Sequence, residues 1–112
     1  NRPNIDMFTK QMENRFVVKT IIDSIPKNLS VASTNNLGSH LSQRENIYTI
    51  PYGLDRADAI VFLLERGYSE IDYQTQLMMI EKLKQDPIFT LEFEDTNFYL
   101  FLRKNLALDF KN

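Results

Sequence analysis

Hydrophobic residues recur at two different spacings along this chain, and each spacing predicts a different kind of element. A helix is predicted over residues 4–25, where apolar side chains recur at helical spacing and Pro26 prevents continuation. A second helix is predicted from Asp72, which can cap its first turn, through about residue 84, before Asp86-Pro87. The apolar positions of the first helix are Met12, Phe16, Val18, Ile22 and Ile25, and the second buries either Leu77, Ile80 and Lys84 or Met79 and Leu83.

Three short segments before the second helix are predicted to be strands. Residues 29–33 follow a turn at 26–28 and are small or β-branched, as in a buried strand. Residues 46–50 form the next strand, which Pro51 ends, and a loop covers residues 52–56. Residues 57–64 are the most hydrophobic run of the chain, so we expect them to form the central strand.

The last two segments alternate between apolar and polar or aromatic positions, which is typical of strands. They cover residues 88–94 and 97–103, and the tight turn Asp95-Thr96 between them predicts an antiparallel hairpin. We expect one face of the hairpin to carry Phe89, Leu91 and Phe93 with Thr90, Glu92 and Glu94 opposite, and the second strand to alternate Phe98, Leu100 and Leu102 against Tyr99, Phe101 and Arg103.

This order of elements, α β α β β α β β, predicts a single compact α/β domain over residues 1–112. The expected sheet is mixed, with Rossmann-like parallel early strands and a C-terminal antiparallel hairpin at its edge, and helices pack on the sheet. The tail, residues 104–112, is expected to be frayed or to be held by Leu106 and Phe110.

Charge and cysteine content exclude several classes of function. The net charge is −2, the pI is about 5.3 and the Lys and Arg residues are scattered, so we expect no nucleic-acid partner. The chain contains no Cys, which excludes disulfides, thiolate metal sites and a Cys nucleophile. It contains no apolar run long enough to span a bilayer, and it begins with Asn rather than Met, so we expect it to be a piece of a longer protein.

Polar residues crowd just past the first predicted strand, where open α/β sheets usually bind ligands. Thr34-Asn35-Asn36 opens a short helix that ends near residue 42, and free N–H groups at a helix start favour anions. Asn side chains both donate and accept hydrogen bonds, which suits sugar hydroxyls. The candidate ligand contacts are Thr34, Asn35, Asn36, His40 and Arg44, with Ser39 and Ser42 beside them. The plainer interpretation, that an Asn only caps the helix and His40 is a surface residue, has more weight because caps are commoner than sites.

The same residues make a weak case for catalysis. His40 is the only His, and neither Ser39 nor Ser42 has the strand-turn-helix setting and glycines of a nucleophile elbow. We therefore expect no catalytic residue, no metal and no cofactor. A small hydrolase that uses His40 is the least favoured hypothesis.

Two other charged clusters are predicted to be structural or solvated. Asp55, Arg56 and Asp58 precede the central strand, at the amino end, and are interpreted as a solvated loop with local ion pairs. Glu92, Glu94 and Asp95 are interpreted as the exposed face of an edge strand, where charge discourages aggregation.

Several segments of the chain together form a recognisable pattern. They are Ile25-Pro26-Lys27, Ser30-Val31-Ala32-Ser33-Thr34-Asn35-Asn36-Leu37, His40-Leu41-Ser42-Gln43-Arg44, Ile47-Tyr48, Ala57-Asp58-Ala59-Ile60-Val61, Asp86-Pro87 and Asn97-Phe98-Tyr99-Leu100-Phe101-Leu102-Arg103. This pattern resembles that of an uncharacterised family of predicted multipass membrane proteins of bacteria and archaea, whose membrane portions are similar to those of GT-C type glycosyltransferases. The resemblance covers about residues 20–103, and Gly38-Ser39 and Gln43 depart from the family pattern, which has Val-Pro and a His there.

The resemblance implies a location rather than a reaction. The chain would be the carboxy-terminal domain of a polytopic membrane protein, on the extracytoplasmic face of the membrane. Its partners would be the membrane-embedded portion of the same polypeptide and a glycan or lipid-linked sugar. The expected function is that of a non-catalytic accessory domain, and the alternative is a purely structural or protein-interaction domain that docks on the membrane portion.

Overall fold

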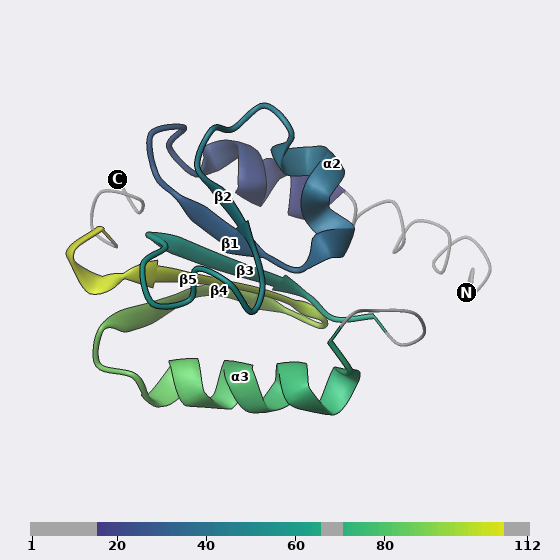
Figure 1. The fold of residues 1–112 in the computed structure, drawn as a ribbon, viewed down its shortest axis with the longest axis vertical. Helices are drawn as coiled ribbons and strands as arrows, with labels where there is room; N and C mark the ends of the chain where they lie inside the picture. Colours follow the sequence, from purple (N-terminus) through teal and green to yellow (C-terminus); the bar gives the residue numbers. More distant parts are fainter. Residues whose placement is uncertain (1–15, 66–70, 107–112) are drawn as a thin grey trace, which may run out of the picture.

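A mixed sheet with helices on both faces forms the fold of the computed structural model, which describes residues 16–65 and 71–106 (Figure 1). Within these residues, five strands lie in the order β2-β1-β3-β5-β4. The first three strands run parallel, and β5 runs antiparallel to both β3 and β4. The strands are β1 (Val31–Ser33), β2 (Ile47–Thr49), β3 (Ala59–Leu63), β4 (Phe89–Asp95) and β5 (Phe98–Arg103). The predicted α/β class, the central position of β3 and the edge hairpin are confirmed.

The Rossmann-like detail of the prediction is not confirmed. The connection from β1 to β2 contains the 3₁₀ helix η1 (Asn35–Leu37) and the short helix α2 (Gly38–Leu41). The connection from β2 to β3 is instead a run of turns, with a cis peptide bond between Ile50 and Pro51. Only one of these two parallel crossovers therefore carries a helix.

Each face of the sheet is covered by a different part of the chain. On one face, Val31, Val61 and Leu100 pack against residues 16–24, which are helical, and against η1 and α2. On the other face, Ile60 and Phe101 pack against α3 (Tyr73–Gln85). Because β3 is covered on both sides, all but the last of its residues are buried, which explains why residues 57–64 are the most hydrophobic run.

The first helix differs from its prediction at one position. Val18, Ile22 and Ile25 are buried as expected, but Phe16 is 70% exposed and does not belong to the buried stripe. Val18 and Ile22 are four residues apart on one helical face, whereas Phe16 lies two residues from Val18 and therefore points elsewhere. The predicted residues 4–15, with Met12, lie outside the described residues.

The second helix begins and ends as its sequence predicts. The Asp72 carboxylate accepts a hydrogen bond from the Thr75 backbone N–H at 2.7 Å, and the helix ends at Gln85 before Asp86-Pro87. Ile80 and Leu83 are buried and Leu77 and Met79 are half-buried, but Lys84 is exposed. Burial of the polar Gln76 is not indicated by the apolar pattern.

A bulge in the hairpin overturns the predicted face of Phe93. Leu91 pairs with Phe101 but Phe93 pairs with Leu100, so Glu92 is an extra residue in β4. The extra residue shifts the alternation by one position. Phe93 therefore packs on the face covered by residues 16–24, whereas Phe89 and Leu91 pack on the face covered by α3. The turn also lies one residue later than predicted, at Thr96 and Asn97.

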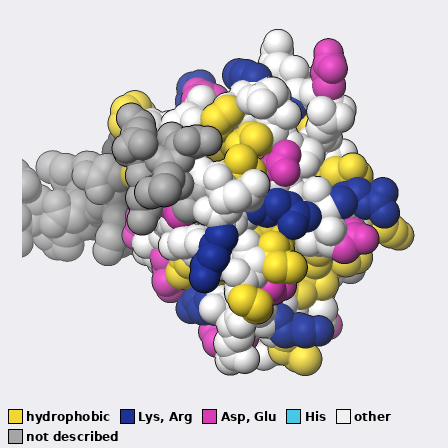
Figure 2. All heavy atoms as spheres, turned by 90° about the vertical axis from the view of Figure 1, so that its left-hand side faces the viewer, with side chains coloured by type: hydrophobic (Ala, Val, Ile, Leu, Met, Phe, Trp, Pro, Cys, Tyr) yellow, Lys and Arg dark blue, Asp and Glu magenta, His cyan; other side chains and the backbone are white. Residues whose placement is uncertain are grey.

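Some residues named in the predictions lie outside the described residues. These are Arg66 and Gly67 after the central strand and Phe110 in the tail; residues 104–106 form a helical turn and Leu106 is half-buried. Within the described residues, the helices are all too short or too polar to cross a bilayer. Figure 2 looks onto the left-hand end of the view in Figure 1 and shows Lys and Arg side chains dispersed among acidic and hydrophobic ones.

Candidate functional site

The predicted polar cluster after β1 is divided by the structure into separate groups. Thr34 and Asn36 form the first group, which joins the ends of β1 and β3. The Thr34 hydroxyl donates to Asn36 Oδ1 at 2.6 Å and accepts from the Leu63 N–H at 3.1 Å. The Asn36 amide donates to the Leu63 carbonyl at 2.9 Å and to Glu65 Oε1 at 3.0 Å. These side chains thus bind their own protein, and neither makes a helix-capping hydrogen bond with its side chain.

Arg44 lies at a different place, under the end of the first helix. Its guanidinium donates to the carbonyls of Ile22, Ile25 and Pro26 at 3.0, 2.6 and 3.0 Å. The Ile22 and Pro26 carbonyls also accept the backbone N–H groups of Ile25 and Leu29, both at 3.1 Å. The negative end of the helix dipole favours a cation at this position. Burial lowers the pKa of Arg44, and the charge of Asp23 opposes this shift. Arg44 is therefore a structural cap and is not available to a ligand, which corrects its predicted role.

His40 and Asn35 are both exposed, and His40 lines a hollow of the surface. The hollow, which we call the edge pocket, has a volume of about 220 Å³. Its polar lining is His40, Glu65, Asp95, Thr96 and Asn97, and its apolar lining is Val17, Val18, Leu63, Leu64 and Phe98. Among the described lining residues, His40 is the one that was predicted as a ligand contact.

The strand pairing explains why residues so distant in sequence meet at the edge pocket. Leu63 at the end of β3 pairs with Phe98 at the start of β5, so the hairpin turn lies beside the carboxyl end of β3. The Leu64 N–H donates to the Asn97 carbonyl at 2.8 Å and fixes the turn there. The pocket therefore lies at the carboxyl edge of the parallel strands. Val17 of the first helix and His40 of α2 line it from the same face of the sheet.

The topology itself favours a ligand at this edge. The chain leaves β1 toward the face that carries η1 and α2, and it leaves β3 toward the face that carries α3. Where neighbouring parallel strands send their connections to opposite faces, a crevice opens outside their carboxyl ends, and open α/β sheets bind ligands there. In this chain Thr34 and Asn36 fill the position between β1 and β3, and the edge pocket lies directly beyond Leu63.

Thr96 holds an unusual backbone conformation in the pocket wall. Its φ of 52° is the left-handed conformation, which costs a β-branched residue free energy. Such conformations persist where the surrounding structure enforces them, and they gather at binding sites. The Thr96 hydroxyl donates to Asp95 Oδ1 at 3.2 Å.

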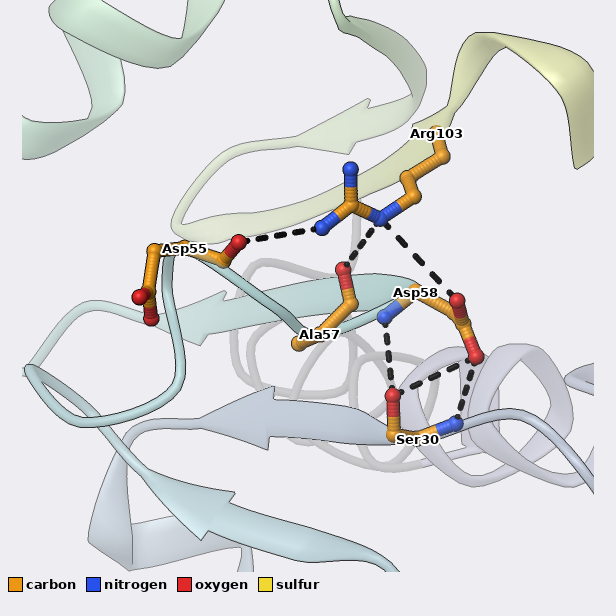
Figure 3. A network of polar contacts seen from close by, with 5 residues as sticks. All are labelled: Ser30, Asp55, Ala57, Asp58 and Arg103. Atoms are coloured by element: carbon orange, nitrogen blue, oxygen red, sulfur yellow. Dashed lines mark hydrogen bonds and ion pairs between the residues drawn. The ribbon is translucent and has the colours of Figure 1, made fainter.

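A second polar network lies at the opposite end of the sheet and is structural (Figure 3). Asp58 Oδ2 accepts from the N–H and hydroxyl of Ser30 at 3.0 and 3.2 Å, and Arg103 Nε lies 4.0 Å from Asp58 Oδ1. Arg103 also donates to the carbonyls of Ala57 and Asp55. The predicted local ion pair is present between Arg56 and Asp55 at 3.6 Å, but Asp58 joins β1, β3 and β5 and is not a solvated loop residue.

The described residues offer little for catalysis. They contain no group of three or more His, Asp or Glu that could hold a metal ion. In the part of the chain that the structure describes, His40 has no hydrogen bond to a hydroxyl or to a carboxylate that would orient it, as a general base requires. The arrangement is suited to holding a polar molecule through hydrogen bonds.

Comparisons with known proteins do not indicate a function for this chain. The chain matches no known family, and no curated protein or solved structure shows significant similarity to it. The geometry of the edge pocket is therefore the principal guide to function.

Of the predicted contacts His40 lines the edge pocket, whereas most of the pocket lining was not predicted from the sequence. Glu65, Asp95, Thr96 and Asn97 were not among the predicted contacts. Three of these residues belong to the predicted hairpin or its turn, which is the one sequence feature that could have indicated them. The turn reaches the carboxyl end of β3 only because β5 pairs antiparallel with β3. Strand order is not readable from hydrophobic alternation, so this juxtaposition could not be predicted.

Proposed function

We propose that this chain is a non-catalytic module that holds a small hydroxyl-rich ligand, such as a sugar, in the edge pocket. The observation that carries the proposal is the pocket's mixture of groups. Carboxylate, amide and imidazole side chains line it beside apolar walls from Val17 and Phe98. Carboxylates accept hydrogen bonds from hydroxyls and the Asn97 amide can both donate and accept, while apolar walls suit the C–H faces of a sugar ring.

The size of the pocket supports a small ligand. Sites for drug-sized molecules span about 300–1,000 Å³. At about 220 Å³ the edge pocket is suited to one sugar residue or the end of a longer glycan. Its position at the carboxyl edge of the sheet also agrees with where open α/β sheets bind ligands.

The sequence resemblance extends this proposal to a location. We infer that the module is an extracytoplasmic accessory domain of a bacterial polytopic membrane protein similar to GT-C type glycosyltransferases. There it would present a glycan or a lipid-linked sugar to the membrane-embedded portion of the same polypeptide.

The alternative is an interaction domain that docks on that membrane portion. An apolar hollow of about 200 Å³ beside the first helix, lined by Phe16, Val17, Thr20, Ile21 and Phe93, favours it. However, the exposed large hydrophobic residues among those described, Phe16, Tyr52, Met78 and Ile88, lie on different segments of the chain. A contiguous apolar face would be a stronger sign of docking, so binding in the edge pocket is the better-supported function.

Titration of the protein with simple sugars tests the proposal. We expect glucose, N-acetylglucosamine or lipid-linked sugar headgroups to shift the backbone amide signals of His40, Glu65 and Asn97. The H40A variant should weaken binding by about three- to tenfold, because it removes one hydrogen bond. The matched control is Q43A, since Gln43 is also exposed but is not among the described residues of the pocket. Unmoved signals with every sugar would exclude the proposed function, and equal losses in both variants would exclude the edge pocket as its site.

A further inference from the structure

The charges around the edge pocket indicate which class of polar ligand it prefers. Two carboxylates line it, Glu65 after β3 and Asp95 at the end of β4. Among the described lining residues there is no Lys or Arg, and His40 is the one basic side chain. Two carboxylates and one imidazole are thus the titratable side chains among the described lining residues.

Neither carboxylate is neutralised by a cation within residues 16–65 and 71–106. Glu65 Oε1 accepts from the uncharged Asn36 amide at 3.0 Å, and Asp95 Oδ1 accepts from the uncharged Thr96 hydroxyl at 3.2 Å. By contrast, the neighbouring Glu94 has Lys84 at 3.9 Å. As far as the described residues go, both negative charges of the pocket therefore remain available to a ligand.

The hydrogen bonds that these acids already make also hold them in place. Asn36 is itself fixed by Thr34 and by the Leu63 carbonyl, so it acts as a positioning residue for Glu65. A carboxylate that is held in position loses less conformational freedom when a ligand binds. This arrangement favours a ligand that donates hydrogen bonds to carboxylates already held in the pocket.

We propose, on the premise that the edge pocket is the ligand site, that it selects small polyols that carry a protonated primary amine. An ammonium group offers three donors and a positive charge, and hydrogen bonds between charged partners are about twice as strong as neutral ones. Anionic ligands, such as sugar acids and sugar phosphates, are disfavoured by repulsion. This reverses the preference for anions expected from a helix start, because α2 is only four residues long and the acids dominate the pocket.

A matched set of four sugars tests the selectivity on the whole chain. Glucosamine carries the amine, N-acetylglucosamine masks it, glucose lacks it, and glucuronate carries a negative charge. We expect glucosamine to bind about tenfold more tightly than glucose or N-acetylglucosamine at low salt, and glucuronate to bind most weakly. The advantage of glucosamine should shrink as ionic strength rises, because salt screens partly exposed charges.

Isosteric variants assign the selectivity to the two acids. E65Q and D95N each keep an oxygen that can accept a hydrogen bond but remove the charge, so each should weaken glucosamine binding several-fold more than glucose binding. E45Q is the control, since Glu45 is exposed and is not among the described lining residues. Equal binding of glucosamine and N-acetylglucosamine, or tighter binding of glucuronate, would overturn the amine selectivity while sugar binding in the pocket still stood. Absence of binding by all four sugars would instead overturn the proposed function, and the amine selectivity with it.

Discussion

Arg44 shows how one residue can be mistaken for a ligand contact when only its sequence neighbours are known. In the sequence it follows a polar segment that ends a short helix, which made it a candidate for binding. In the structure it is 8% exposed and its guanidinium binds three carbonyls at the end of the first helix. Its partners are 18 to 22 positions away in the sequence, so local pattern could not reveal them.

Replacing Arg44 should therefore affect stability rather than binding. We expect R44A to lower the free energy of unfolding by about 3 kcal/mol, because three carbonyls at the end of the first helix lose a charged donor and two of these hydrogen bonds are buried. R56A, at an exposed position with only a 3.6 Å contact to Asp55, should change it by less than about 0.5 kcal/mol. Urea unfolding of both variants measures the difference. A stable R44A protein that has lost sugar binding would contradict the structural role.

At the scale of single elements, sequence pattern predicted most of what the structure shows. The periodicity of β5 and of α3, and the buried run of β3, each reflect packing on one or both faces of the sheet. The failure at Phe93 has a local cause, since a single bulged residue moves every later side chain of the strand to the other face. No composition signal in residues 88–94 marks that extra residue.

The cap of α3 makes stability depend on pH in a defined direction. Hydrogen bonds from the side chain and the backbone of Thr75 lower the pKa of Asp72 below its ordinary value of 3.8. Because the folded pKa is the lower one, the stabilisation is complete above pH 3.8 and is lost as the pH falls through the folded pKa.

We therefore expect D72A to have a lower melting temperature than the parent at pH 7. The difference between the two proteins should shrink as the pH falls below about 4. Thermal unfolding followed by circular dichroism over pH 2.5–7 measures it. A difference that stayed constant down to pH 2.5 would show that the Asp72 charge contributes nothing to the cap.

At the scale of the whole molecule, the two ends of the sheet, at the amino and carboxyl ends of its parallel strands, differ in structure. The amino edge of the parallel strands is closed by Asp58, Ser30 and Arg103, which join β1, β3 and β5. The carboxyl edge carries the edge pocket. The sequence predicted a ligand at the carboxyl edge from fold class alone, but strand order decided which residues meet there, and strand order arises from long-range pairing.

The closed edge gives a prediction of its own. D58A should lower the free energy of unfolding by about 2 kcal/mol, because the Ser30 N–H and hydroxyl lose their acceptor and Arg103 loses its carboxylate. D55A is the matched control, since the Asp55 side chain is 78% exposed and Arg103 uses only its carbonyl. Chemical denaturation compares them. Equal destabilisation by D55A and D58A would show that the network does not depend on the Asp58 side chain.

The most direct measurement is to locate a bound sugar on the protein. Intermolecular nuclear Overhauser effects between glucosamine and the isotope-labelled chain report which protons are in contact. We predict contacts from the sugar ring to the methyl groups of Val17 and to the hairpin turn at Thr96 and Asn97, which line the edge pocket. Contacts to the amino edge around Ser30 and Asp58, or no contacts at saturating glucosamine, would contradict it.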